Sequence, residues 1–224
     1  EFMPKQYEGL KSIFLLPIVG TLVIGVLMVN LGVPIAAINN SMMEFLSGLQ
    51  DANPVMLGII IGMMCAFDFG GPVNKAAYVT GTLLLAEGNM YFMAGVSAAC
   101  ITPPLVVAIA TTIFKRAFDE EERTAGAICY ILGATHITEG AIPFVAKAPH
   151  HVIPIMMLAS SISAVLSFLF AVQVPAPHGG FLILPVVSEP IVWVACILVG
   201  SAVGAVLYGL YRVMQMKKLI VRAS

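Results

Sequence analysis

Apolar residues follow one another in long continuous runs along this chain, and four of these runs contain 20 residues or more. A bilayer core of ~30 Å requires about 20 apolar residues in a helix that crosses it. Continuous runs predict helices, whereas a membrane β-barrel would show alternating apolar and polar positions. We therefore expect four spanning helices, at Ile13–Ala37, Tyr91–Phe114, Val152–Val172 and Ile191–Val213.

Between these spans lie apolar segments that are too short or too interrupted to cross a membrane alone. They are Val55–Phe67, Thr80–Ala86, Ala125–Phe144 and Phe181–Val187. Glycine and proline border or interrupt them, which is typical of discontinuous helices and re-entrant hairpins. The predicted fold class is an all-α integral membrane protein, a multi-spanning helical transporter with re-entrant, broken-helix hairpins.

Positive charges predict the orientation in the membrane. They gather before the first span, between the second and third, and after the last, at Lys5, Lys11, Lys115, Arg116, Arg123, Arg212, Lys217, Lys218 and Arg222. All three regions, and both ends of this segment, are expected to be cytoplasmic. The loop near 39–53 is then external. Between Arg123 and Arg212 the chain must cross an even number of times. Three apparent segments lie there, so either one of them turns back, for which Ala125–Phe144 is the best candidate, or Phe181–Val187 makes an extra crossing.

The same pattern gives the expected organisation. Residues 1–12 form a cytoplasmic N-terminal segment, 13–213 a membrane domain, and 214–224 a basic cytoplasmic tail. Glu1 and Phe2 precede Met3 and are equally compatible with a cloning remnant and with natural sequence. The first apolar run follows a polar start and is long enough to span, so it is not predicted to be a signal peptide.

Composition supports the membrane class and excludes others. The chain is 59% hydrophobic and 10% charged, with a mean hydropathy of +0.98, whereas soluble domains contain ~25% charged residues. A net charge of −1 gives no reason to expect a nucleic-acid partner. The four cysteines lie in apolar runs without Cys-x-x-Cys spacing, so we expect small buried side chains and neither disulfides nor a metal site.

Glu139 is a lone carboxylate within an apolar segment. An ionisable group at bilayer depth costs ~2.5–3.5 kcal/mol, so it normally faces a cavity, a partner or a substrate. Gly140 and Pro143 break the helix just beyond it and free backbone groups. Glu139 and the neighbouring Thr138 could accept hydrogen bonds from hydroxyl groups of a polar solute. The alternative is that Glu139 only satisfies the freed backbone.

Two histidines are further candidates. His136 precedes Glu139 by three residues and would share its face in a helix, where it would either orient the carboxylate or contact a substrate. His178 precedes Gly179 and Gly180 in a turn whose backbone could approach a ligand closely. A loop histidine without a role is nearly as plausible at that position.

A third group surrounds Gly70-Gly71-Pro72. Asp68 and Lys75 could form an ion pair or line a cavity from a loop, or both could be solvated at an interface. Asn74 can donate and accept, which suits a sugar hydroxyl, but it could equally cap the following helix. Other charges are expected to be solvated in loops or interfacial, at Glu44, Glu87, the Asp119–Glu122 run, His150 and His151. We identify no catalytic constellation, phosphate-cradling loop or metal-ligand spacing.

Three stretches together resemble a known family: 67–78 (FDFGGPVNKAAY), 137–144 (ITEGAIPF) and 174–180 (VPAPHGG). The pattern is similar to the membrane-spanning IIC component of fructose-family phosphoenolpyruvate-dependent sugar phosphotransferase systems. The first two motifs are long and specific, the third is shorter but falls in the right order, and the resemblance covers nearly the whole chain.

The resemblance implies a permease that binds a sugar outside, moves it inward and presents it to a IIB domain for phosphorylation. Thr138 and Glu139 match the Ile-Thr-Glu motif of the family, and 70–75 and 177–180 match its other two motifs. The expected sugar contacts are Glu139, Thr138, His136, Asn74, Lys75, Asp68, His178 and Gly179, with no cofactor. Expected partners are the sugar, the IIB and IIA domains and the lipid bilayer of the bacterial cytoplasmic membrane. A homodimer is expected at full length.

Two departures from the family pattern qualify this expectation. His136 stands where a small or apolar residue is expected, so its role is not implied by the resemblance. Family members also have further spans ahead of Lys5, so the chain resembles the C-terminal two-thirds of a IIC domain. The substrate could be fructose, a fructose-like sugar or 2-O-mannosylglycerate. The competing hypotheses are an ion-coupled transporter with protons relayed by Glu139, Asp68 and His136, and a structural membrane subunit.

Overall fold

The computed structural model describes residues 14–223, except for the side chains at 35, 38, 39, 42, 43, 47, 50–52 and 219–223. The predicted N-terminal segment 1–12 lies outside the described residues. The chain divides into two compact units, residues 1–45 and 46–224. All regular secondary structure in the described residues is helical, as predicted, with turns and loops between the helices.

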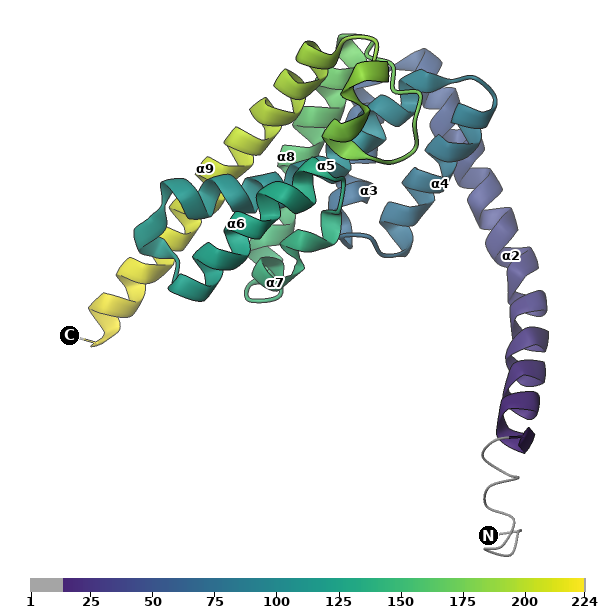
Figure 1. Ribbon diagram of the computed structural model, residues 1–224, viewed down its shortest axis with the longest axis horizontal. Helices are drawn as coiled ribbons and strands as arrows, with labels where there is room; N and C mark the ends of the chain where they lie inside the picture. The colour runs from purple at the N-terminus through teal and green to yellow at the C-terminus, as the bar shows by residue number, and fades with distance from the viewer. Residues whose placement is uncertain (1–13, 224) are drawn as a thin grey trace, which may run out of the picture. The chain divides into compact units, whose positions relative to one another are not determined.

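Residues 16–45 of the first unit form most of helix α2 (Leu16–Ala52, purple in Figure 1). Its 16–34 portion is long and apolar enough to span a membrane, and none of it is buried within the protein. The external loop predicted near 39–53 is wrong, because α2 continues to Ala52. Polar residues at 39–41 lower the hydropathy without breaking a helix. Helix α2 ends just before Asn53, whose side-chain oxygen caps α3 by accepting the backbone N–H groups of Val55 and Met56.

The second unit is a helical bundle built around α5 (Met90–Ile113), whose side chains are almost all buried. Helices α3 (Pro54–Phe67), α6 (Glu120–Ala134), α8 (Pro149–Leu169) and α9 (Pro190–Ala223) pack on it or on one another (Figure 1). The most extensive contact joins α3 to α8, where a Cβ on Gly62 would overlap the backbone of Ser161. Small residues that allow such close approach are typical of membrane helix packing.

Four of the described helices are long and apolar enough to cross a membrane, at Leu16–Pro34, Met90–Ile113, Pro149–Leu169 and Pro190–Lys218. They match the four predicted spans with small shifts at the ends. Residues 214–223, predicted to be a basic tail, continue α9.

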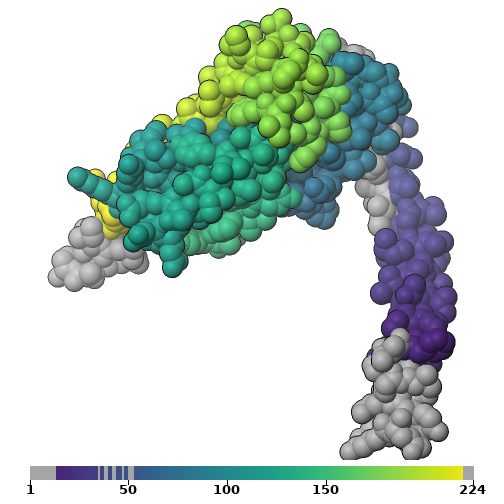
Figure 2. Space-filling view, viewed as in Figure 1, coloured from purple at the N-terminus to yellow at the C-terminus, as the bar shows by residue number. Residues whose placement is uncertain are grey.

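The predicted short segments are short or broken helices. Helix α3 is 14 residues long, about 21 Å at 1.5 Å per residue, and is joined by a turn at 68–71 to α4 (Pro72–Ala86). After α6 come a 3-10 helix η4 (Thr138–Ala141) and the one-turn helix α7 (Ile142–Val145). The 173–187 segment contains a 3-10 helix η5 (Gly180–Val186). Its surface lies against that of α6 in Figure 2.

The segment that holds Glu139 turns back on itself. Lys147, just after α7, donates to Glu122 in the first turn of α6 over 2.8 Å, so the two ends of the segment meet. This reversal agrees with the hairpin predicted for Ala125–Phe144. We call residues 120–147 the site hairpin.

The prediction that the whole Asp119–Glu122 run is solvated is wrong for Glu122, which is only 4% exposed. Asp119 and Glu122 form a capping box at the start of α6, each accepting the backbone N–H of the other. Glu122 also forms ion pairs with Lys147 and Arg212, which offset the cost of burying its charge. A run of charges in sequence cannot reveal partners that lie 25 and 90 positions away.

Candidate functional site

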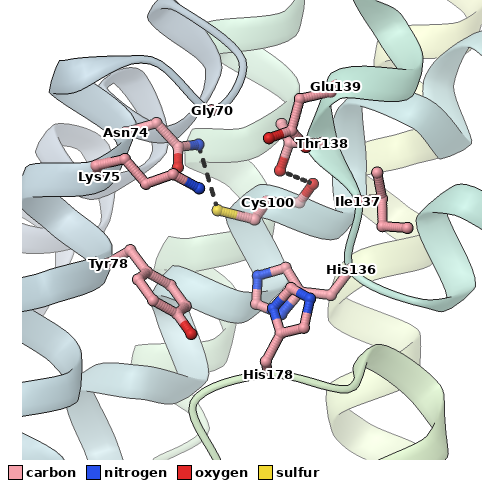
Figure 3. A pocket seen from close by; sticks show the side chains of 10 residues that line it. All are labelled: Gly70, Asn74, Lys75, Tyr78, Cys100, His136, Ile137, Thr138, Glu139 and His178. Carbon is pink, nitrogen blue, oxygen red and sulfur yellow. Dashed lines mark hydrogen bonds between the residues drawn. The ribbon is translucent and has the colours of Figure 1, made fainter. Parts of the chain in front are cut away.

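A cavity of about 500 Å³ lies where α4, α5, the break after α6 and the 173–179 loop meet (Figure 3). All of these elements belong to the second unit. The cavity lining combines one carboxylate, one ammonium group, two imidazoles, a phenol, an amide, a thiol and a threonine hydroxyl. The lining residues are Gly70, Asn74, Lys75, Tyr78, Cys100, His136, Ile137, Thr138, Glu139 and His178.

Asp68 holds the start of α4 in place. Its two carboxylate oxygens accept the backbone N–H groups of Val73 over 2.7 Å and Asn74 over 3.0 Å. These amides have no partner within the helix, so the carboxylate stabilises the helix terminus. Among the described residues no ion pair joins Asp68 to Lys75, and Asp68 is not one of the lining residues.

Asn74 and Lys75 project from the first turn of α4 at the cavity. Asn74 does not cap the helix. Its Nδ2 donates to the backbone oxygen of Cys65 over 2.7 Å and lies 3.5 Å from the sulfur of Cys100. Lys75 is exposed, and its Nζ lies 5.8 Å from the centre of the Tyr78 ring one turn further along. One face of α4 therefore supplies an amide, a cation and a phenol.

Two consecutive prolines in α5 explain where the site hairpin docks. Pro103 and Pro104 have no N–H, so the carbonyls of the residues four positions earlier, Ala99 and Cys100, lose their helical donors. Thr138 fills one vacancy by donating its hydroxyl to the oxygen of Cys100 over 3.0 Å.

The other vacancy is filled from α8, where Ser160 donates its hydroxyl to the oxygen of Ala99 over 2.9 Å. Because the Thr138 hydroxyl donates its proton to the oxygen of Cys100, its own oxygen remains available as an acceptor.

Glu139 enters the cavity beside Gly70, which lies in the turn between α3 and α4. The side chain of Glu139 is exposed to the cavity and solvent. Gly70 has φ +97°, and a Cβ there would overlap Oε1 of Glu139. The turn therefore requires glycine both for its backbone conformation and for the room that the carboxylate takes. On the other side of the hairpin, Cys129 donates to the oxygen of Gly140 over 3.2 Å.

His136 and His178 stack face to face, with ring centres 4.6 Å apart and planes 23° from parallel. The edge of Tyr78 meets both rings, at 6.4 Å and 6.2 Å. His136 is 4% exposed, and its Nδ1 has no hydrogen-bond partner among the described residues. Figure 3 shows the pair at the end of the cavity opposite Glu139.

The stacked pair depends on close contact between two turns. His136 has φ +67°, which is unusual for a residue with a side chain. A Cβ on Gly180 would overlap the oxygen of Ala134, so the turn after His178 presses directly against the backbone before His136. Gly179 (φ +123°) shapes that turn but is not a lining residue.

Burial lowers the pKa of His178, and the neighbouring His136 and Lys75 lower it further. The ordinary value is 6.5, so His178 is neutral at pH 7. His178 therefore presents a neutral imidazole at this end of the cavity, which donates one hydrogen bond and accepts one. Within residues 14–223 no group of three His, Cys, Asp or Glu is arranged to hold a metal ion.

The structure brings six of the eight predicted contacts to one cavity: Asn74, Lys75, His136, Thr138, Glu139 and His178. It places Asp68 and Gly179 behind the lining. Sequence motifs do not predict Tyr78 and Cys100 as lining residues. Tyr78 follows Asn74 by four positions, so helical spacing could have found it. Cys100 lies in an apolar run with no distinguishing signal.

An all-helical membrane domain whose polar cavity lies at breaks in short helices is the architecture of a membrane permease. The chain belongs to the family described as "Phosphotransferase system, EIIC", whose model matches residues 1–159. This confirms the resemblance inferred from the three motifs.

Relatives in several bacteria carry matching names. The chain is 39% identical over 212 residues to the "Fructose permease IIC component" of Bacillus amyloliquefaciens, covering 94% of this chain and 69% of the relative. It is 46% identical over 185 residues to the "PTS system fructose-specific EIIB'BC component" of Rhodobacter capsulatus, covering 82% and 32%.

It is also 39% identical over 212 residues to the "PTS system fructose-specific EIIABC component" of Bacillus subtilis, covering 94% and 33%. The chain thus spans about a third of these multidomain relatives. No solved structure matches.

Proposed function

We propose that this chain is the sugar-binding and translocating membrane part of a fructose-type phosphotransferase system. The substrate is fructose or a fructose-like sugar, with 2-O-mannosylglycerate as the alternative. The observation that carries the proposal is the cavity itself, where one carboxylate and several neutral polar groups converge at helix breaks. The names of the relatives support the choice of sugar.

The lining suggests a role for each group. Glu139 accepts hydrogen bonds from sugar hydroxyls, and Thr138 accepts another because its proton is already used. Lys75 donates to a sugar oxygen from the opposite wall. The stacked imidazoles of His136 and His178 offer further donors and acceptors to the sugar at the other end of the cavity. Asp68 and Gly179 act indirectly, by holding α4 and the 173–179 loop in place.

Transport proceeds by alternating access, in which the hairpins that hold the sugar expose it first outside and then inside. A partner IIB domain then phosphorylates the sugar, and a IIA domain supplies the IIB domain. The phosphorylated product carries about two negative charges, so its return through an apolar membrane is strongly unfavourable. The phosphoryl chemistry belongs to the partners, and this chain contributes binding and translocation.

The positive charges give the proposed orientation. Lys115 and Arg116 follow α5, Arg123 lies in α6, and Lys217 and Lys218 lie near the end of α9. Positive residues accumulate on the cytoplasmic side of membrane proteins. Both ends of the segment and the face that meets the IIB domain are therefore cytoplasmic. The intact permease is proposed to be a homodimer in the bacterial inner membrane.

The test is uptake and phosphorylation of radiolabelled sugars by cells that express the intact permease, with and without the phosphotransferase cascade. We expect Glu139→Gln to lower sugar affinity about tenfold, because a charge-assisted hydrogen bond becomes a neutral one. Glu87→Gln, an exposed carboxylate in the turn after α4, is the matched control and should leave uptake unchanged.

Each outcome has a distinct meaning. Cascade-dependent uptake of fructose that weakens in Glu139→Gln supports the proposal, and the sugar panel names the substrate. Uptake that ignores the cascade and collapses with an uncoupler would instead identify an ion-coupled transporter. Uptake unaffected by Glu139→Gln would remove that carboxylate from the site.

A further inference from the structure

Glu122 is a buried carboxylate outside the sugar cavity, and both of its oxygens are fully engaged. Oε1 accepts from Nζ of Lys147 over 2.8 Å, and Oε2 accepts from Nη2 of Arg212 over 2.6 Å. Oε2 also accepts the backbone N–H of Asp119 over 3.1 Å. Its neighbours in the acidic run are exposed, so this carboxylate alone was drawn into the protein.

The contact with Lys147 closes the base of the site hairpin. Glu122 lies in the first turn of α6, and Lys147 lies just after α7, so the pair joins the two ends of the segment that carries Thr138 and Glu139. Nearer the cavity, Cys129 of α6 holds the oxygen of Gly140. Two contacts thus hold the site hairpin together: the Glu122–Lys147 ion pair at its two ends, and the Cys129–Gly140 hydrogen bond nearer the cavity.

The contact with Arg212 fastens that base to a spanning helix. Arg212 belongs to α9, and its guanidinium also donates to the backbone oxygen of Ala117 over 3.1 Å. The same group lies 4.8 Å from the centre of the Phe118 ring, which packs against Tyr208 of α9. Arg212 therefore binds both the segment just before α6, at Ala117, and the Glu122 carboxylate within α6.

The two contacts differ in environment. The side chain of Lys147 is 51% exposed, whereas that of Arg212 is 23% exposed. Solvent can replace much of what Lys147 supplies, but the bond to Arg212 is formed in a site largely closed to water. Arg212 also makes a forked contact that an ammonium group cannot reproduce.

We propose that Glu122 is a positioning residue for sugar translocation, which closes the site hairpin through Lys147 and couples it to α9 through Arg212. The inference rests on the proposed function, because it assigns a role in sugar transport. Loss of the Arg212 contact leaves the cavity intact but frees the hairpin from the helix with which it must move. Loss of the Lys147 contact loosens the hairpin and displaces Thr138 and Glu139.

The test compares fructose uptake and fructose binding in membranes from cells that express the intact permease and its partner domains. We expect Arg212→Met to lower the maximal uptake rate about tenfold with little change in KM, as for coupled contacting residues. Lys147→Met should instead raise KM and weaken fructose binding. Arg123→Met, an exposed cation one residue after Glu122, should change neither.

A double variant protects the test against misfolding. Arg212→Met leaves a buried carboxylate short of a partner, which can unfold a protein. Glu122→Gln combined with Arg212→Met removes both charges, so the fold should survive while the contact is lost. We expect the double variant to reach the membrane at wild-type levels and still transport slowly.

The outcomes separate this inference from the proposed function. Wild-type uptake of the double variant would show that the pair only neutralises charge and would overturn the positioning role. Changes confined to the amount of folded protein, with KM and rate per molecule unchanged, would overturn it as well. If the wild-type permease itself fails to take up fructose with its cascade, the proposed function fails instead.

Discussion

The substitution Gly70→Ala tests whether the turn between α3 and α4 places the carboxylate of Glu139. Gly70 has φ +97°, and an alanine in the left-handed region costs about 1–2 kcal/mol. The added Cβ would also overlap Oε1 of Glu139, so the flexible carboxylate must move. A hydrogen bond to a charged group contributes about 1.5–3 kcal/mol. If the carboxylate leaves the sugar, binding should weaken about 10- to 100-fold.

The control separates backbone strain from displacement of the carboxylate. Gly88 has φ +91°, and no atom lies within 4 Å of where its Cβ would be. Gly88→Ala therefore carries the same backbone cost without the contact. Binding of radiolabelled fructose to membranes gives the dissociation constant for each variant. Equal binding by Gly70→Ala and Gly88→Ala would refute the reasoning. So would a Gly70→Ala effect that is undiminished when Glu139 is already Gln, because coupled sites should not be additive.

Three further predictions concern the cavity lining. In a variant that keeps Cys100 as its sole cysteine, fructose should slow alkylation by a small maleimide, and equal rates with and without sugar would place the sugar elsewhere. Burial lowers the pKa of His178 from 6.5, so the folded state is stabilised above that value and loses this stability as the pH falls. Fructose affinity measured between about pH 5 and pH 8 should fall at the acid end, and His178→Asn should remove that fall. Pro104→Ala restores a backbone donor for the carbonyl of Cys100, which then competes with Thr138, so it should weaken fructose binding about three- to tenfold. Pro103→Ala is the control and should leave fructose binding unchanged. Equal effects of the two substitutions would contradict the link to Thr138.

The membrane architecture could be predicted because hydropathy is a local property. Each of the four spans is an apolar run of sufficient length, and the structure places helices there with small shifts at the ends. The segment at 39–53 could not be assigned in this way. Its polar residues lower the hydropathy, yet nothing breaks the helix before Asn53, so α2 continues. Hydropathy distinguishes apolar from polar segments and does not by itself distinguish helix from loop.

The candidate site could be predicted in large part because its residues carry unusual local signals. Glu139 is a lone carboxylate in an apolar segment, and glycine and proline mark the turns beside it. The roles of individual residues could not be predicted, since they depend on partners distant in sequence. Asp68 proves to cap α4, and Glu122 proves to join three elements. Cys100 gave no signal at all, because its position on the cavity follows from the packing of α5.

Helix breaks in this protein do more than leave room for a ligand, because side chains from other elements donate to the freed carbonyls around the cavity. The oxygen of Cys65, in the last turn of α3, accepts from Asn74 of α4. The oxygen of Cys100, freed by Pro104, accepts from Thr138 of the site hairpin. Both bonds are formed by residues that line the cavity. In an apolar medium such bonds are costly to leave unmade, so the same interactions that complete the fold also fix the polar groups around the cavity.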